Sequence, residues 1–214
     1  MIRMEKKINQ LLSRSVELEK KLLQNINTEF LTHSPRNEAS RILSIVSFEH
    51  AESLKMLLAS GNFTSSIGLL RLQYEAFVRA LWVFYSASDI AVSKLMSELT
   101  AESARKTQKL PMLSEMLKKL EGKAPKIVSD QVLEFKEYSW KPLSSYIHGG
   151  IHAIQRHSKG YPVQLLIQTV KASNGVSLMA AMFLIIIAND ISKRGLMPII
   201  QREFKDCLPD EKIS

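Results

Sequence analysis

Three charged side chains recur every four residues in an otherwise apolar stretch of the chain. They are Arg71, Glu75 and Arg79, and the stretch ends in the apolar and aromatic run 81–85. Residues four apart lie on the same face of an α-helix, so these side chains are expected to share one face. An arginine and a carboxylate placed this way form either a structural salt bridge or one wall of a polar site.

A second segment, residues 144–152, offers groups that would complete such a site. It reads Ser-Ser-Tyr-Ile-His-Gly-Gly-Ile-His and supplies one phenol and two imidazoles. These groups both donate and accept hydrogen bonds, and imidazole also transfers protons near neutral pH. We therefore predict six ligand-binding side chains: His50, Arg71, Glu75, Tyr146, His148 and His152. If the site is catalytic, we expect its catalytic residues to be His148, Arg71 and Glu75.

His50 enters this prediction through its expected height in the fold. It lies about eleven residues before the turn at Gly61, and Arg71 lies about ten residues after it. At 1.5 Å per residue, two antiparallel helices joined there would bring His50 and Arg71 level to within about one turn. The same side chains could instead form a purely structural network that pairs buried charges, and both interpretations stay open.

Other kinds of chemistry find less support. His148 and His152 are four apart and could share a metal with a third ligand, but the two glycines between them weaken the helix that would align them. The Glu-x-x-His pattern of di-iron bundles is absent. There is also no Gly-x-Ser-x-Gly elbow, no phosphate-binding loop and no dinucleotide fingerprint. We predict neither a metal nor a cofactor.

Composition favours a folded, non-exported protein. The 214 residues are 45% hydrophobic, and the single cysteine, Cys207, rules out an internal disulfide. The charged N-terminus lacks the apolar core of a signal peptide, and the longest apolar run, 176–188, is shorter than the roughly 20 residues of a membrane span. We expect a cytoplasmic location and no membrane contact.

Net charge raises the question of a nucleic-acid partner. The chain carries +8 at pH 7, and basic surfaces bind phosphate by releasing counterions. Basic and acidic residues are mixed along the sequence, however, as in the segment 17–21, and even the least balanced part, 105–126, contains Glu115 and Glu121. An RNA or nucleotide ligand is therefore one candidate beside an ordinary solvated basic face.

Helices account for the whole pattern in the N-terminal half. Residues 1–30 repeat apolar positions every three or four residues, which predicts a long amphipathic helix that packs on its own chain or forms a two-chain seam in a homodimer. Ser34-Pro35 marks the start of a second helix that ends before Gly61. Thr64 is expected to cap a third helix reaching about residue 86, and Ser88 a fourth reaching about residue 106.

The C-terminal half is more interrupted. Proline and glycine cut residues 108–129 into a short helix and a loop, a helix is expected over 130–138, and Pro142 is expected to turn the chain. Pro162 should start a long buried helix ending near 193–195, with a short helix after Pro198. No segment shows the alternation of a strand. We predict an all-α antiparallel bundle of about seven or eight helices: an N-terminal helix over 1–30, a bundle over 34–207 and a flexible tail over 208–214.

Two segments, 69–82 and 145–152, resemble a group of bacterial helical proteins known only as domains of unknown function. The likeness rests on an Arg-x-x-x-Glu helix and a later Tyr-x-His-Gly, and it spans about His50 to Asp190. It implies a bacterial cytoplasmic protein in which Arg71, Glu75, Tyr146 and His148 form a common site.

More distantly, the helical layout resembles the HEPN class, some of whose members are metal-independent ribonucleases in toxin or phage-defence systems. Those enzymes place a histidine after an arginine with four to six residues between them, whereas eight residues separate Arg41 from His50, and His148 precedes Arg156. Our leading hypothesis is a binding or interaction module acting in stress or phage defence. The alternative is a HEPN-like ribonuclease in which His148 acts as acid and base and Arg71 stabilises phosphate charge.

Overall fold

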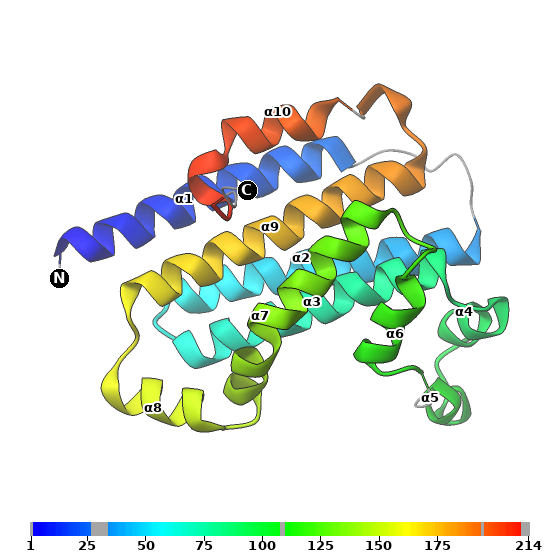
Figure 1. The fold of residues 1–214 in the computed structure, drawn as a ribbon, viewed down its shortest axis with the longest axis horizontal. Helices are drawn as coiled ribbons and strands as arrows, with labels where there is room; N and C mark the ends of the chain where they lie inside the picture. Colours follow the sequence, from blue (N-terminus) through cyan, green and yellow to red (C-terminus); the bar gives the residue numbers. More distant parts are fainter. Residues whose placement is uncertain (1, 27–33, 108–109, 194, 211–214) are drawn as a thin grey trace.

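The protein is built from helices throughout the part of the chain that the computed structural model describes, which is residues 2–26, 34–107, 110–193 and 195–210. The all-α bundle predicted from the sequence is confirmed (Figure 1). The described residues form ten α-helices, more than the seven or eight expected: α1 (Ile2–Ile26), α2 (Pro35–Ala59), α3 (Phe63–Tyr85), α4 (Asp89–Leu95), α5 (Ala101–Thr107), α6 (Leu113–Leu120), α7 (Lys126–Ile147), α8 (Ile151–Lys159), α9 (Val163–Ala188) and α10 (Leu196–Glu203). Two short 3₁₀ turns, Ile191–Lys193 and Lys205–Cys207, flank α10.

Helices α2 and α3 form the antiparallel hairpin expected around Gly61. The Ser34 side chain caps α2 by accepting the Asn37 N–H at 3.1 Å, and Gly61 takes a φ of 82°, which favours glycine. Two serine hydroxyls then join the helices. Ser47 donates to the carbonyl of Gln73 at 3.0 Å, and Ser66 donates to that of Leu54 at 2.8 Å. These two bonds fix the relative height of the two helices.

Helix α9 lies at the centre of the bundle, against α1, α2 and α3 (Figure 1). A buried polar pair joins it to α3, because Gln73 Nε2 donates to the Ser173 carbonyl at 2.9 Å and Ser173 Oγ donates to Gln73 Oε1 at 2.7 Å. Among the described helices, α9 is long and apolar enough to cross a membrane by composition, but most of its apolar window is buried inside the fold. A central helix of a bundle has the same composition, since it must be apolar on all sides.

Helix α1 packs along α9 within the same chain, one of the two arrangements that its sequence allowed. Leu18 and Leu22 are fully buried in this seam. Ser15, which interrupts the apolar repeat, accepts a hydrogen bond from Asn174 Nδ2 at 2.7 Å, so its hydroxyl is paired rather than stranded. Residues 27–30 of the predicted helix lie outside the described residues.

Several predicted boundaries are wrong. Pro142 does not turn the chain but lies inside α7, because Leu143 and Tyr146 beyond it are buried and keep the helix in the core. The expected helix over residues 89–106 is two helices, α4 and α5. Thr64 does not cap α3, since its hydroxyl bonds to that of Tyr161.

The C-terminal end also differs from the prediction. Helix α9 ends at Ala188, where Asn189 adopts a left-handed φ of 53°. Pro198 lies in the first turn of α10, where a missing N–H has no partner to lose. Leu208, the first residue of the predicted tail, is buried, while residues 211–214 lie outside the described residues.

Candidate functional site

Arg71, Glu75 and His148 come together at the surface between α3 and α7. Arg71 Nε donates to Glu75 Oε1 at 2.7 Å, and Arg71 Nη1 lies 3.2 Å from His148 Nε2. The guanidinium also stacks on Trp140, with its carbon 4.1 Å from the ring centre. The Arg71 side chain is 16% exposed and that of Glu75 27% exposed, whereas His148 is open to solvent. Arg71 is thus held on three sides by groups of different chemistry.

The contact between Arg71 and His148 depends on the tautomer of the imidazole. A guanidinium has donors only, so the 3.2 Å contact is a hydrogen bond only if His148 Nε2 accepts. The ring proton must then be on Nδ1.

Gly68 brings α7 close enough to α3 for these contacts. It precedes Arg71 by three residues and therefore lies on the same face of α3. A Cβ placed on Gly68 would lie 3.3 Å from Cγ1 of Ile147, in the last turn of α7. A larger side chain would push away the end of α7 that carries His148.

The His-Gly-Gly sequence has a structural role at the end of α7. His148 is the C-cap residue of α7 and Gly149 has a φ of 65°. The Gly150 N–H donates to the Ser145 carbonyl at 2.7 Å. This is the bonding of a Schellman motif. Ser145 Oγ also accepts the His152 N–H at 3.0 Å, which joins the start of α8 to the end of α7. The motif therefore positions His148 whether or not a ligand binds.

Tyr146 and His152 lie beside the Arg71 cluster but form a separate contact. Tyr146 is buried, and its ring centre is 6.0 Å from that of the exposed His152. Burial raises the pKa of the Tyr146 phenol, while the nearby charge and hydrogen bond of Arg156 act in the opposite direction. Tyr146 therefore stays protonated at neutral pH.

His50 and Arg79 do not join the cluster. The bonds of Ser47 and Ser66 confirm that His50 is nearly level with Arg71, but within the described residues His50 has no hydrogen bond to Arg71, Glu75 or His148. Arg79 continues the charged face of α3, yet its Nε is buried with no hydrogen-bond partner in the described part of the chain. The expected height of His50 and the helix face that Arg79 shares with Arg71 therefore predicted that these residues lie near the cluster, but not that they contact it.

Trp140 was not predicted as a site residue, because the chain was expected to turn at Pro142, two residues later. Trp140, Ser144 and His148 are four apart, so on a continuous helix they follow one face. That spacing would have placed an aromatic ring beside His148 if α7 had been predicted to continue through Pro142. The wrongly predicted helix end at Pro142 therefore concealed the spacing that links Trp140 to His148.

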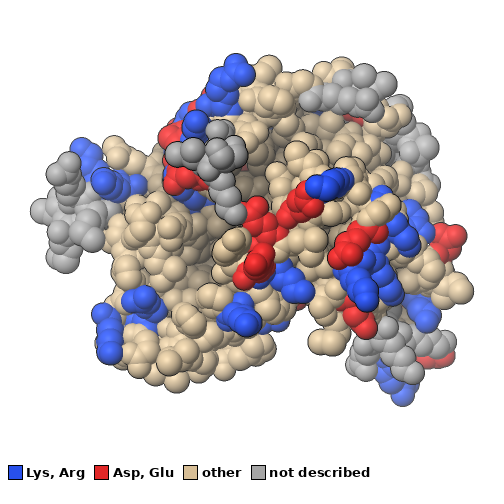
Figure 2. All heavy atoms as spheres, viewed as in Figure 1, with Lys and Arg blue, Asp and Glu red and all other residues tan. Residues whose placement is uncertain are grey.

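The segment that contains His148, residues 138–189, has basic side chains but no carboxylates. Residues 138–189 contain no Asp or Glu, although they include seven basic or imidazole side chains: Lys141, His148, His152, Arg156, His157, Lys159 and Lys171. Helix α8 exposes most of its side chains, including Ile151 and Ile154. Figure 2 shows Lys and Arg without Asp or Glu over the α8 end of the visible face, whereas acidic side chains gather along the middle.

The described residues contain no group of three His, Cys, Asp or Glu side chains placed to hold a metal ion. The Arg71 cluster has one carboxylate and one imidazole, and the imidazole Nε2 is used by Arg71. Its chemistry is therefore that of a fixed cation beside an exposed imidazole and an aromatic ring. Such a set binds anions and planar groups.

Comparison with known proteins identifies a family. Residues 44–210 match a family described as Family of unknown function (DUF6988). No curated protein and no solved structure matches the chain. The matched region includes α3, α7 and α8, and hence every residue of the Arg71 cluster, but not α1.

Proposed function

We propose a function for this chain, which belongs to the family of unknown function DUF6988: it is a binding module for phosphate-bearing ligands, RNA or nucleotides. The observation that carries the proposal is the absence of Asp and Glu from residues 138–189, the segment that supplies Trp140 and His148 to the Arg71 cluster. A locally cationic surface raises the concentration of polyanions and steers them to the site.

The cluster supplies the contacts that a phosphate or a base requires. Arg71 is already held by Glu75 and Trp140, so little side-chain entropy is lost when a ligand binds. His148 is exposed beside it. Cationic side chains next to aromatic rings are how proteins bind single-stranded nucleic acid, because the cations contact phosphate and the rings stack on bases. The site therefore fits a flexible single strand better than a rigid duplex.

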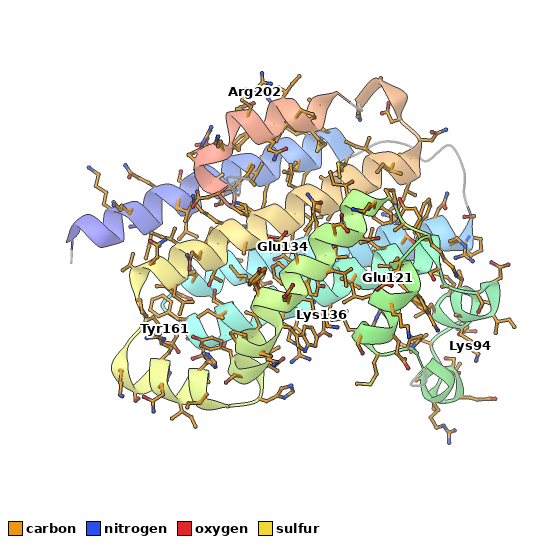
Figure 3. All side chains as sticks on the ribbon, in the orientation of Figure 1. Lys94, Glu121, Glu134, Lys136, Tyr161 and Arg202 are labelled. Atoms are coloured by element: carbon orange, nitrogen blue, oxygen red, sulfur yellow. The ribbon has the colours of Figure 1, made fainter. Side chains whose placement is uncertain are left out.

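The proposal is tested by the affinity of a labelled single-stranded RNA, measured by fluorescence anisotropy. The variant R156A/K159A removes two exposed cations from α8. The matched control K94A/R202A removes two exposed cations from α4 and α10, which lie away from α8 in Figure 3. We expect the α8 variant to bind about tenfold more weakly, with a salt dependence smaller by roughly 0.7 per cation that contacts phosphate.

The proposal requires that the RNA affinity of the α8 variant falls more than that of the control. Equal weakening by both would indicate non-specific attraction to the net charge, and undetectable binding by the unmodified protein would reject the proposal. Vesicles of anionic lipid form a comparison arm, because exposed Ile151 and Ile154 beside cations also suit a lipid surface. Tighter binding to vesicles than to RNA would contradict an RNA ligand.

A metal-independent ribonuclease is the second candidate, and the 3.2 Å contact between Arg71 and His148 favours it. If Arg71 Nη1 turned from the imidazole to a phosphate, His148 Nε2 would be free to take the proton of a ribose 2′-hydroxyl. The 2′-oxygen would bond to phosphorus as the bond from phosphorus to the 5′-oxygen breaks, and the proton that His148 took would pass to this 5′-oxygen. Arg71 would stabilise the added negative charge.

This candidate has its own test. Labelled RNA is incubated without added metal with the unmodified protein and with His148→Ala. Cleavage by the former only would support the enzyme, and no cleavage, or equal cleavage by both, would reject it. With either function, we place the protein in the bacterial cytoplasm, which rests on the resemblance to bacterial helical proteins of unknown function. A role in stress or phage defence rests on the resemblance to HEPN proteins.

A further inference from the structure

A groove of about 660 Å³ runs between α1 and α2, two helices that contribute no residue to the Arg71 cluster. Its lining includes four exposed apolar side chains, Val16 and Leu23 from α1 and Ile45 and Met56 from α2. Met56 is 66% exposed, far more than an apolar side chain in a folded core. Adjacent exposed apolar residues on two neighbouring helices mark an interaction surface.

The spacing of the lining residues suits a helical partner. On α1 the groove takes residues 12, 16, 19 and 23, and on α2 it takes 45, 49, 52 and 56. Steps of three and four place each set along one helix face, as in the seams of helical bundles. The adjacent seam of α1, with Leu18 and Leu22, is already buried within the chain. Helix α1 thus has two apolar faces, of which one is covered.

The charges at the groove are arranged differently on its two sides. At the floor, Lys55 Nζ and Glu19 Oε1 form an ion pair at 2.5 Å. The α1 rim carries Lys20, whereas the α2 rim carries Glu49 and Glu52. Within the described residues, none of these three rim side chains forms a salt bridge.

We propose that the groove binds a second copy of this chain, with a two-fold axis running along it. Rotation about such an axis places α1 of one copy over α2 of the other and leaves every residue at its own height. Helices α1 and α2 run antiparallel (Figure 1), and the bond from Lys55 to Glu19 sets their common level. Lys20 then lies two residues from the level of Glu52, about 3 Å along the helix, so each base meets an acid of the other copy.

The test is the molar mass in solution, measured by light scattering at about 100 µM protein. We expect twice the 24.2 kDa of the chain. Met56→Glu should halve this mass. The matched control, Ile90→Glu, alters an exposed apolar residue on α4 outside the groove and should leave the dimer intact. Circular dichroism of each variant shows whether it is folded, so that loss of the dimer is not confused with unfolding.

A charge exchange tests the arrangement itself. Glu52→Lys alone should weaken the dimer at least tenfold, because it sets two lysines against each other, and adding Lys20→Glu should restore it. A monomeric unmodified protein, or a dimer that survives Met56→Glu, would overturn the proposal. Failure of the exchange to restore the dimer would overturn the two-fold arrangement.

Discussion

The side chains of the Arg71 cluster bond to one another, so the same contacts stabilise the fold and shape the site. Arg71 bonds to Glu75 and His148 and stacks on Trp140, all within the chain. The sequence predicted the Arg71–Glu75 pair from its four-residue spacing. It could not predict Trp140, because a proline two residues later suggested a turn where the tertiary packing of Leu143 maintains a helix.

The structural contribution of Arg71 is measured by its replacement with alanine. We expect Arg71→Ala to lower the free energy of unfolding by about 2 kcal/mol, since it removes a charged hydrogen bond from Glu75. Urea denaturation provides the measurement. Arg79→Ala is the matched control on the same helix, and because Arg79 Nε has no partner among the described residues, its loss should be smaller. Equal losses would show that the bond to Glu75 contributes little.

The ion pair below the α1–α2 groove provides a second prediction at this scale. Lys55 is 5% exposed, and burial lowers the pKa of its ammonium. Removing only its partner, with Glu19→Leu, leaves a buried charge unpaired and should cost roughly 3–5 kcal/mol. The double variant E19L/K55M should return to within about 1 kcal/mol of the unmodified protein, since both desolvated charges are gone.

A double-mutant cycle by urea denaturation, run at a protein concentration low enough to avoid association, checks this result. A double variant as unstable as Glu19→Leu would show that the loss comes from packing of the side chains rather than from the unpaired charge.

At the scale of elements, local signals predicted the helix ends that depend on local chemistry. Ser34 caps α2, Gly61 lies in the turn that follows α2, and Pro162 precedes α9, as expected. Boundaries set by long-range packing were missed. Pro142 lies within α7, and the approach of α7 to α3 depends on Gly68, whose role is visible only when Ile147 is seen beside it. The sequence shows that a glycine is present but not which distant side chain needs the space.

The contact between α3 and α7 gives a prediction of its own. Gly68→Val should destabilise the fold by about 1–3 kcal/mol, because its side chain meets Ile147. Ile147→Ala in the same chain should recover part of the loss by making room. Urea denaturation followed by tryptophan fluorescence would report both stability and the surroundings of Trp140. No recovery in the double variant would mean that the substitution acts on α3 alone.

At the scale of the whole molecule, charge is organised by the fold in a way that short sequence windows conceal. The basic and acidic residues appeared mixed, and segment 105–126 looked least balanced. The longer run 138–189 has no acid at all, and the structure gathers its α7 and α8 portions at one end of the bundle (Figures 1 and 2). The all-α class followed from periodicity alone, whereas this cationic end required both the charge count and the path of the chain.

The central claim is that a phosphate-bearing ligand binds at the Arg71 cluster, and the two indoles of the chain test it most directly. Trp140 stacks on Arg71, while Trp82 is buried in the core and serves as an internal control. The indole N–H signals are followed by NMR during titration with single-stranded RNA. We predict that the Trp140 signal shifts and saturates while the Trp82 signal stays in place. An unchanged Trp140 signal with RNA bound would contradict the claim.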